Sequence, residues 1–331
     1  MTTQELNAIT VADDLVEFLE NHPSHLACVH SVFPHALNLL LPEDQLITLT
    51  SQDDPTPMGL TVESGLSFTE FLKAGAQVVL DVDRFTWVNG LLTVSLREAE
   101  VWETSSVMPL EVRSAEDLAQ IKLHLLRWLS KQPSEGLLPL LPRLTRQSID
   151  LKPAIGNIYS RYIANDLEAF TYAIYASYWQ RALLLADKLV GFGMGSTPSC
   201  DDFLAAYLVV LTIADASCPG QYPWIREFTQ TIVRKAKNRT TLISANMIRH
   251  GADGKTSQSH QQLIQTCLYD TNGELELLAD QVMKQGATSG GDFLLGLICA
   301  LEWVQNTMMD ISKEGERARV GIKQPQPVPG I

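Results

Sequence analysis

A break between two helical patterns falls at residues 191–204, which read Gly-Phe-Gly-Met-Gly-Ser-Thr-Pro-Ser-Cys-Asp-Asp-Phe-Leu. A segment rich in Leu and Ala ends at the first glycine, and an apolar run begins at Phe203. Glycines tolerate positive φ and let a ligand approach the backbone. A new helix presents unpaired N–H groups at its positive end. The stretch therefore predicts two helices joined by a tight loop that can bind phosphate or carboxylate.

Helical periodicity extends on both sides of this loop, from about residue 112 onward. We expect helices over 114–131, 160–190, 199–214, 224–236, 239–250, 256–269, 273–286 and 290–306. Residues 133–157 carry four prolines and read as a connector with short helical turns. The tail, residues 313–331, is charged and then rich in Pro and Gln, and we expect it to be disordered.

Short β-type runs separated by turn residues fill the chain from about residue 25 to residue 105. Val88-Asn89-Gly90 is typical of a hairpin turn. Residues 4–21 fit an amphipathic helix. The sequence thus predicts an α+β protein: a β-rich domain at 1–110, either a small barrel or an antiparallel sheet, followed by a mainly α-helical domain at 111–312.

Composition limits the classes of function. The 331 residues carry a formal net charge of −13, with 45% hydrophobic and 19% charged residues, which disfavours nucleic acid and anionic membranes as partners. No apolar run reaches the length that a membrane span needs. Five scattered cysteines and a polar N-terminus predict a cytoplasmic protein with reduced thiols. The spacing of the histidines and cysteines predicts no metal site.

A second copy of the pattern Ser-x-x-Asp-Phe-Leu lies 90 residues further along the chain. Ser289-Gly290-Gly291-Asp292-Phe293-Leu294 matches Ser199-Cys200-Asp201-Asp202-Phe203-Leu204. Each copy follows a loop of small residues and opens an apolar helix. The repeat predicts that two helix N-termini converge on one ligand. The alternative is structural, because each Ser-x-x-Asp is also a capping box that starts its own helix.

A third polar element lies between the two copies. Thr241 and Ser244 share one face of the expected helix 239–250, where their hydroxyls can bond a ligand or bond back to the helix carbonyls. Arg249 and His250 come just before Gly251, where cations stabilise a helix C-terminus.

These three elements resemble the H subunit of the three-subunit oxamate carbamoyltransferase of allantoin degradation, formerly a family of unknown function. The family's Gly-x-Gly-x-Gly-x-Thr-Pro-Ser-Gly-Asp-Asp-Phe block corresponds to 191–203, its Thr-x-x-Ser helix to Thr241 and Ser244, and its Gly-x-x-Ser-Gly-x-Asp block to 286–292. Cys200 replaces a glycine of the family pattern. A thiol at a helix N-terminus can be reactive, or it can simply be packed.

The resemblance implies transfer of a carbamoyl group, either from oxalurate to phosphate, giving oxamate and carbamoyl phosphate, or in reverse. We expect the backbone of Gly193 and Gly195, with the hydroxyls of Thr197 and Ser199, to hold the phosphoryl group, and Arg249 or Arg239 to pair with the substrate carboxylate. The remaining candidate substrate-binding residues are Asp201, Asp202, Thr241, Ser244, Ser289, Gly290 and Asp292.

The three aspartates do not decide whether the site needs a metal cofactor. Carboxylates repel a bare anion, so if they face the ligand, a Mg²⁺ ion or an amide or ammonium group lies between. If they cap their helices, no metal is required. The catalytic residues stay unknown, because the sequence contains no evident pair of nucleophile and base.

Two functional classes follow. The first is a carbamoyltransferase subunit that binds a small anionic metabolite, and the second is a non-catalytic binding or assembly subunit that works with other protein subunits. A purely structural interpretation of the glycine blocks predicts that Ser289→Ala lowers stability by about 1 kcal/mol without changing ligand affinity.

Overall fold

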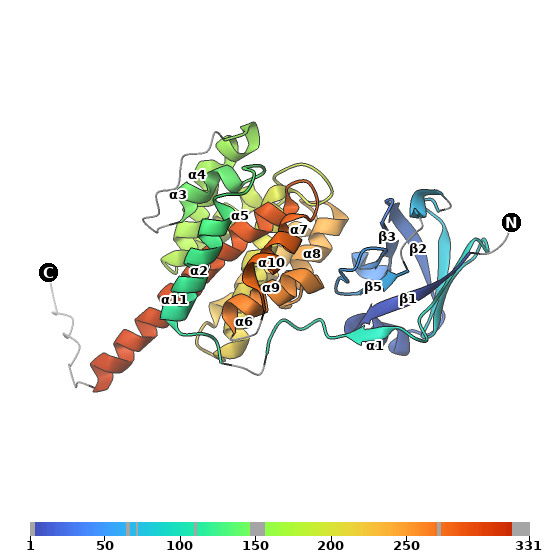
Figure 1. Ribbon diagram of the computed structural model, residues 1–331, viewed down its shortest axis with the longest axis horizontal. Helices are drawn as coiled ribbons and strands as arrows, with labels where there is room; N and C mark the ends of the chain where they lie inside the picture. Colours follow the sequence, from blue (N-terminus) through green and yellow to red (C-terminus); the bar gives the residue numbers. More distant parts are fainter. Residues whose placement is uncertain are drawn as a thin grey trace.

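The computed structural model describes residues 4–63, 67–70, 72–108, 111–145, 156–269 and 273–319, with side chains up to residue 308 in the last helix. A mixed β-barrel over residues 4–102 is followed by a helical domain (Figure 1). The predicted α+β class, with a β-rich domain first, is confirmed. Closure of the sheet selects the barrel over the open antiparallel sheet.

The barrel closes because its first strand has neighbours on both edges. Strand β1 (Gln4–Ala12) pairs antiparallel with β5 (Gly59–Val62) and parallel with β8 (Leu92–Ser95). The order β5-β4-β3-β2-β6-β7-β8-β1 therefore returns to β5, and β9 (Glu100–Trp102) extends β1. The other strands are β2 (His25–Val32), β3 (Ala36–Leu40), β4 (Leu46–Thr50), β6 (Gln77–Asp81) and β7 (Arg84–Trp87).

Alternation along the strands fills the interior of the barrel. Buried side chains recur at every second position, as in Leu37 and Leu39 or Val78 and Leu80. The expected hairpin at Val88-Asn89-Gly90 joins β7 to β8, and Gly90 takes a φ of 71° there.

The helix expected over residues 4–21 is wrong in its first half. Residues 4–12 form β1, and only α1 (Asp13–Asn21) is helical. Leu6 and Ala8 are buried with period two inside the barrel, while Leu15 and Leu19 are buried with period four. Pairing of β1 with strands far along the chain decides its conformation, and a local pattern cannot show that.

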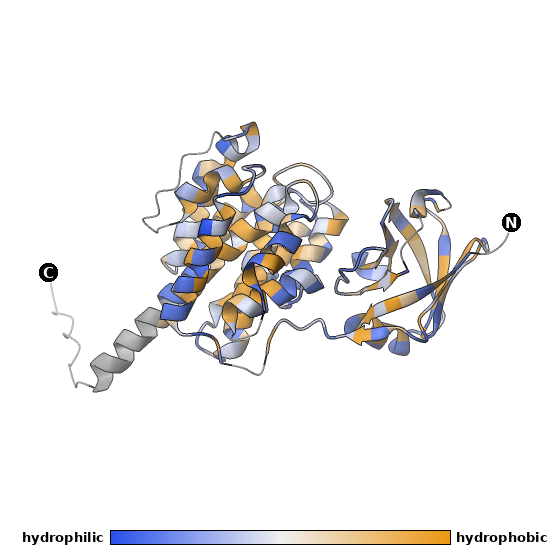
Figure 2. Ribbon diagram, in the orientation of Figure 1, coloured by the Kyte–Doolittle hydropathy of each residue, from blue (hydrophilic) through white to orange (hydrophobic). Residues whose placement is uncertain are grey.

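Helix α6 (Ser199–Ser217) runs through the middle of the helical domain, with nearly every side chain up to Ile213 buried. Figure 2 shows apolar ribbon in the middle of this domain. The surrounding helices are α2 (Ala115–Leu129), α3 (Leu141–Leu144), α4 (Ile158–Tyr175), α5 (Trp179–Leu189), α7 (Trp224–Ala236), α8 (Leu242–Ala252), α9 (Gln258–Leu268), α10 (Leu275–Met283) and α11 (Ser289–Arg319).

Helices α6 and α11 form the most extensive helix pair of the domain. A side chain at Gly296 would lie 2.3 Å from the carbonyl oxygen of Phe203, so the two backbones approach closely there. Tyr207 adds a hydrogen bond of 3.1 Å from its hydroxyl to the carbonyl of Cys299. This contact fixes the relative position of the two helix N-termini.

The helix boundaries differ most from expectation at the α4–α5 break and at the end of α11. The segment expected as one helix over 160–190 is divided into α4 and α5 at Ser177, whose φ is 59°. Helix α11 continues to Arg319 and so passes the boundary expected at residue 312. Residues 320–331 of the predicted disordered tail lie outside the described residues.

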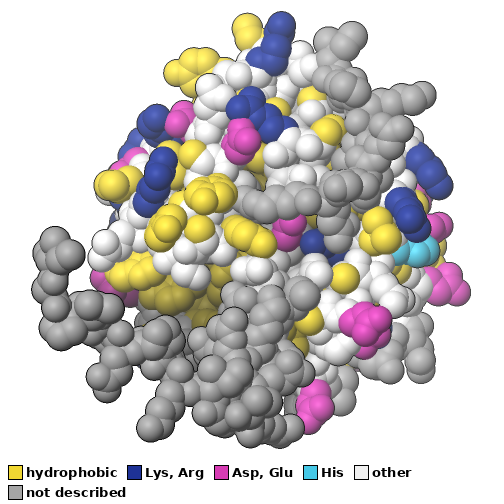
Figure 3. All heavy atoms as spheres, turned by 90° about the vertical axis from the view of Figure 1, so that its left-hand side faces the viewer, with side chains coloured by type: hydrophobic (Ala, Val, Ile, Leu, Met, Phe, Trp, Pro, Cys, Tyr) yellow, Lys and Arg dark blue, Asp and Glu magenta, His cyan; other side chains and the backbone are white. Residues whose placement is uncertain are grey.

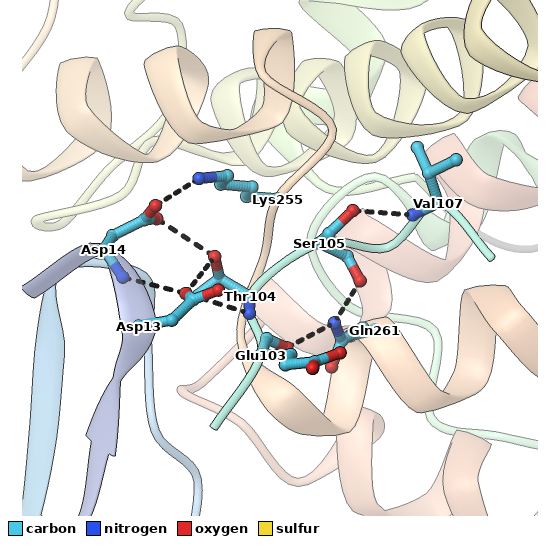
Figure 4. Close-up of polar contacts among 8 residues, drawn as sticks. All are labelled: Asp13, Asp14, Glu103, Thr104, Ser105, Val107, Lys255 and Gln261. Atoms are coloured by element: carbon cyan, nitrogen blue, oxygen red, sulfur yellow. Dashed lines mark hydrogen bonds and ion pairs between the residues drawn. The ribbon is translucent and has the colours of Figure 1, made fainter. Parts of the chain in front are cut away.

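Polar contacts join the two domains (Figure 4). Asp14 of α1 forms an ion pair with Lys255, and the Thr104 hydroxyl donates to Asp13 at 2.7 Å and to Asp14 at 3.0 Å. Gln261 of α9 donates to the carbonyl oxygens of residues 103 and 105 at 3.0 and 2.7 Å. The barrel is therefore attached through α1 and the segment that follows β9, and further contacts join Leu46 to Asn246 and Asp54 to Ser259.

Candidate functional site

The two copies of the repeated motif meet in space. Helix α6 begins at Ser199 and α11 begins at Ser289. The hydroxyl oxygens of Thr197 and Ser289, 92 residues apart in sequence, lie 3.0 Å from each other. We call the two helix starts with their preceding loops, residues 191–202 and 286–292, the α6–α11 junction.

The capping-box interpretation of the first copy is wrong. The residue at the N-cap of α6 is Pro198, and no side chain caps this helix end, so Ser199 is already the first helical residue. The serines instead face the aspartates of the other copy. Burial raises the pKa of both aspartates, and the Ser289 hydroxyl opposes the rise at Asp202 while the Ser199 hydroxyl opposes it at Asp292. Each motif thus supplies a hydroxyl to the carboxylate of its counterpart.

Asp201 is saturated by hydrogen bonds within the protein. Its carboxylate accepts from the Gly191 N–H at 2.8 Å, from the Ser244 hydroxyl at 2.7 Å and from the Thr240 hydroxyl. Burial raises the pKa of this carboxyl, and the three donors oppose the rise. Asp201 therefore acts as a tie between the glycine loop, α6 and the start of α8.

Asp202 and Asp292 differ from Asp201. Both are buried, at 3% and 0% exposure, and the Oδ2 atom of each has no hydrogen-bond partner among the described residues. Burial raises the pKa of Asp202 well above its usual range, with the neighbouring Asp292 charge adding to the rise. Burial also raises the pKa of Asp292 to about 6. The junction thus contains two buried acceptors without a partner among the described residues, together with the partly exposed side chains of Thr197, Ser199 and Ser289.

The glycines of the first loop fall into two groups. Gly193, with a φ of 135°, has no room for a side chain, because a Cβ there would lie 2.3 Å from the Ser199 nitrogen. Gly195 also has a positive φ, 92°, but a side chain added there would meet no atom within 4 Å. Gly193 therefore shapes the loop, whereas Gly195 leaves its backbone open to a ligand.

Gly290 has a packing role. A Cβ at this position would lie 1.9 Å from the Val282 carbonyl oxygen, and the Gly290 N–H already donates to the carbonyl of Gln285 at 3.1 Å. The first turn of α6 is similarly occupied, since the Cys200 N–H donates to the carbonyl of Phe192 at 3.0 Å. The helix ends thus offer a ligand fewer free N–H groups than we expected. The hydroxyls and the N–H groups of the glycine loop are the other donors at the junction.

Thr241 and Ser244 also bond within the protein. Helix α8 begins at Leu242, so Thr241 is its N-cap and accepts from the Ser244 N–H at 3.1 Å. The Thr241 hydroxyl donates to the carbonyl of Ser196. Thr241 contacts the glycine loop directly, and Ser244 contacts it through Asp201, so both residues position the loop.

Among the described contacts neither candidate arginine has its side chain bonded to the junction, although the carbonyl oxygen of Arg239 packs against Gly191, the first residue of the junction. Arg249 lies in the last turn of α8, about 12 Å along the helix axis from Thr241. Burial lowers the pKa of His250 and the Arg249 charge adds to the fall, whereas burial raises the pKa of Asp253 and the Arg249 charge opposes the rise. Arg239 forms an ion pair with Asp187 at 3.0 Å.

Cys200 is packed. It is fully buried, and burial together with the charges of the nearby aspartates raises the pKa of its thiol well above the usual range. This direction is opposite to the one that a reactive thiol needs. In the described part of the chain, no group of three or more His, Cys, Asp or Glu side chains has an arrangement that could hold a metal ion.

One segment of the junction was missed. The backbone N–H of Leu137 donates to Asp292 Oδ1 at 2.6 Å, and Gly136, with a φ of 55°, packs directly against that carboxylate. Asn157, the N-cap of α4, donates to the Gly136 carbonyl at 2.7 Å. Gly136 in the proline-rich connector was the one feature of the sequence that could have indicated this segment, but no pattern near it in the sequence relates it to Asp292.

Comparison with protein-family models gives two matches. A model described as "Oxamate carbamoyltransferase subunit AllH" matches residues 189–301, and one described as "AllH family N-terminal domain" matches residues 7–101. The chain belongs to the AllH family. The first match contains the whole junction, from the glycine loop to Asp292, and the second contains most of the barrel. The AllH chain matches no solved structure.

Because the first match contains residues 191–203 and 286–292, the resemblance predicted from these motifs is confirmed. The family description is that of an enzyme subunit. In the described residues, no helix has the length and apolar character needed to cross a bilayer.

Proposed function

We propose that this AllH chain binds a small anionic metabolite of the oxamate carbamoyltransferase reaction at the α6–α11 junction. The observation that carries the proposal is the pair of buried carboxyl groups, Asp202 and Asp292, each with an Oδ2 that has no partner among the described residues, at the junction where Thr197 and Ser289 meet. A buried polar atom without a partner destabilises a protein by about 1–3 kcal/mol. Such atoms where two motifs meet are typical of a site that a ligand completes.

The anionic part of the ligand fits the outer layer of the junction. Two helices direct their positive N-terminal ends there, and the hydroxyls of Thr197, Ser199 and Ser289 become donors to the anion when they turn away from the aspartates and from each other. The open backbone at Gly195 supplies a further N–H. Oxamate, oxalurate, phosphate and carbamoyl phosphate all carry the negative charge that these donors bind.

The chemistry that the family resemblance implies needs little covalent participation by side chains. A phosphate oxygen forms a bond to the carbamoyl carbon, the carbon–nitrogen bond of oxalurate breaks, and the proton of the phosphate hydroxyl ends on the oxamate nitrogen. Holding both reactants in place supplies much of the rate, and fixed donors stabilise the developing oxyanion. We assign the junction residues to binding and orientation, and we assign no nucleophile.

A second candidate, a binding or assembly subunit without turnover of its own, is favoured by exposed apolar side chains. Tyr162 of α4 is 77% exposed, Leu184 of α5 is 72% exposed and Met194 of the glycine loop is 68% exposed. Figure 3 shows hydrophobic side chains gathered on the end of the helical domain that faces away from the barrel. Exposed apolar surface of this kind is typical of protein contacts, and we propose that other subunits cover it.

Thermal unfolding of the full chain with and without ligand tests the binding proposal. Oxamate, oxalurate, phosphate or carbamoyl phosphate at 100 times its Kd should stabilise the chain by about 2.7 kcal/mol, a rise in Tm of several degrees. Magnesium should not be needed for this rise. No shift with any of the four ligands would favour the assembly role.

Ser289→Ala separates binding from packing in the same assay. We expect this variant to lose most of the ligand-induced shift. The matched control is Ser130→Ala, which removes a hydroxyl at the end of α2, where it donates to the Arg127 carbonyl. A Ser289→Ala variant that is less stable yet binds with unchanged affinity would support the purely structural interpretation.

A further inference from the structure

The unsatisfied carboxylate oxygens define the part of the ligand that is not anionic. Asp202 and Asp292 only accept hydrogen bonds in their ionised form, and this is the form to which we assign the ligand, although burial raises the pKa of both groups. Their Oδ2 atoms are buried without a partner among the described residues, and the neighbouring hydroxyls of Thr197 and Ser289 already contact each other. A ligand group that reaches these oxygens must therefore bring its own donors.

In the described residues no group of three or more His, Cys, Asp or Glu side chains surrounds these oxygens, and two donated hydrogen bonds would satisfy both of them. A planar NH₂ group does so, because its two hydrogens point in different directions and it carries no charge that the helix ends would repel. A methyl group of the same size leaves both acceptors unpaired.

We infer that Asp202 and Asp292 recognise the NH₂ group of a carboxamide or carbamoyl ligand and reject the isosteric methyl ketone or acetyl compound. This inference rests on the proposed function and adds the determinant of specificity. Oxamate, oxalurate and carbamoyl phosphate each combine a negative end with an NH₂ end, so the donors of the outer layer bind the first and the two carboxylates bind the second. Asp202 carries more of the discrimination, because Asp292 also holds the Leu137 N–H at 2.6 Å.

Pairs of compounds that differ only in NH₂ against CH₃ test the inference directly. Oxamate and pyruvate have the same size and charge, as do carbamoyl phosphate and acetyl phosphate. Isothermal titration of the full wild-type chain should give a Kd for oxamate about 10- to 100-fold lower than for pyruvate, because the methyl compound leaves a buried acceptor unpaired.

The Asp202→Asn variant extends the test. Its amide supplies the missing hydrogen itself, so the preference for oxamate should fall to less than about threefold while pyruvate still binds. Asp280→Asn is the matched control, since Asp280 lies on the outside of α10 in an ion pair with Lys284, and it should keep the full preference.

The outcomes are distinguishable. Equal Kd values of oxamate and pyruvate for the wild-type chain would overturn recognition of the NH₂ group while leaving the anion site in place. A preference that survives in Asp202→Asn would overturn the assignment to Asp202. Failure of oxamate, pyruvate, phosphate and carbamoyl phosphate to bind at all would overturn the proposed function and this inference with it. Because the wild-type comparison needs no variant, misfolding of Asp202→Asn would not remove the test.

Discussion

Asp292→Asn should stabilise the folded chain above pH 6 by about 3 kcal/mol and weaken ligand binding at the same time. Burial raises the pKa of Asp292 to about 6, well above the ordinary value of 3.8, and one pKa unit corresponds to about 1.4 kcal/mol. An asparagine keeps an oxygen for the Leu137 N–H and places an uncharged NH₂ group near Ser199 and Asp202. The repulsion between the two carboxylates disappears, and so does the free acceptor that we assign to the ligand.

The sign of the pH dependence follows from the direction of the shift. Between about pH 4 and pH 6 the unfolded chain has already lost this proton while the folded chain retains it, so the contribution of Asp292 to the free energy of unfolding falls as the pH rises through this range. Above pH 6 the contribution is constant. Asp202, whose pKa is also raised by burial, changes stability in the same direction.

Denaturant unfolding of wild type, Asp292→Asn and the control Asp280→Asn at pH 4.5 and pH 8 measures the effect. The three proteins should differ little at the lower pH, and Asp292→Asn should be the most stable at pH 8. An Asp292→Asn variant less stable than wild type at pH 8 would show that the carboxylate is needed for folding and is not kept for a ligand.

Gly290→Ala should destabilise the helical domain by about 3 kcal/mol, although alanine favours helices more than glycine does. Its Cβ would lie 1.9 Å from the Val282 carbonyl oxygen and 2.9 Å from Met283 Cα, and neither backbone atom can move unless α10 and α11 separate. The shift would also displace Ser289 from Thr197.

The adjacent residue provides the control. A Cβ at Gly291 would meet Leu138 Cδ1 at 2.9 Å, which is the end of a flexible side chain. Gly291→Ala should therefore change the free energy of unfolding by less than about 1 kcal/mol. Equal losses for the two variants, measured by chemical denaturation, would contradict the close approach of α10 to the start of α11.

The helical half of the fold could be predicted because its patterns are local. The apolar run after Asp202 and the one after Asp292 each specify a buried helix, and the recurrence of Ser-x-x-Asp-Phe-Leu indicated that the two helix starts belong together. The barrel was predicted only as one of two alternatives. Its closure depends on the pairing of Ala8 with Val62 and of Leu6 with Val94, contacts between segments that carry no mark of each other.

The hydrogen-bond partners of the site residues could not be predicted from the sequence for the same reason. Ser199 followed by Asp202 is the spacing of a capping box, but Pro198 takes the N-cap position and directs the serine to Asp292 instead. Likewise, Arg249 had the right charge for a substrate carboxylate, yet it lies at the far end of α8 from Thr241. Spacing along the sequence indicates where a helix begins or ends. Contacts between helices decide which groups the residues at that end bind.

A crystal structure of the full chain with oxamate tests the central claim most directly. The account predicts one ordered oxamate at the α6–α11 junction, with its carboxylate on the hydroxyls of Thr197 and Ser289 and its NH₂ group within hydrogen-bond distance of Asp202 Oδ2. An oxamate bound elsewhere on the chain, with Thr197 and Ser289 still in mutual contact and the junction empty, would contradict it.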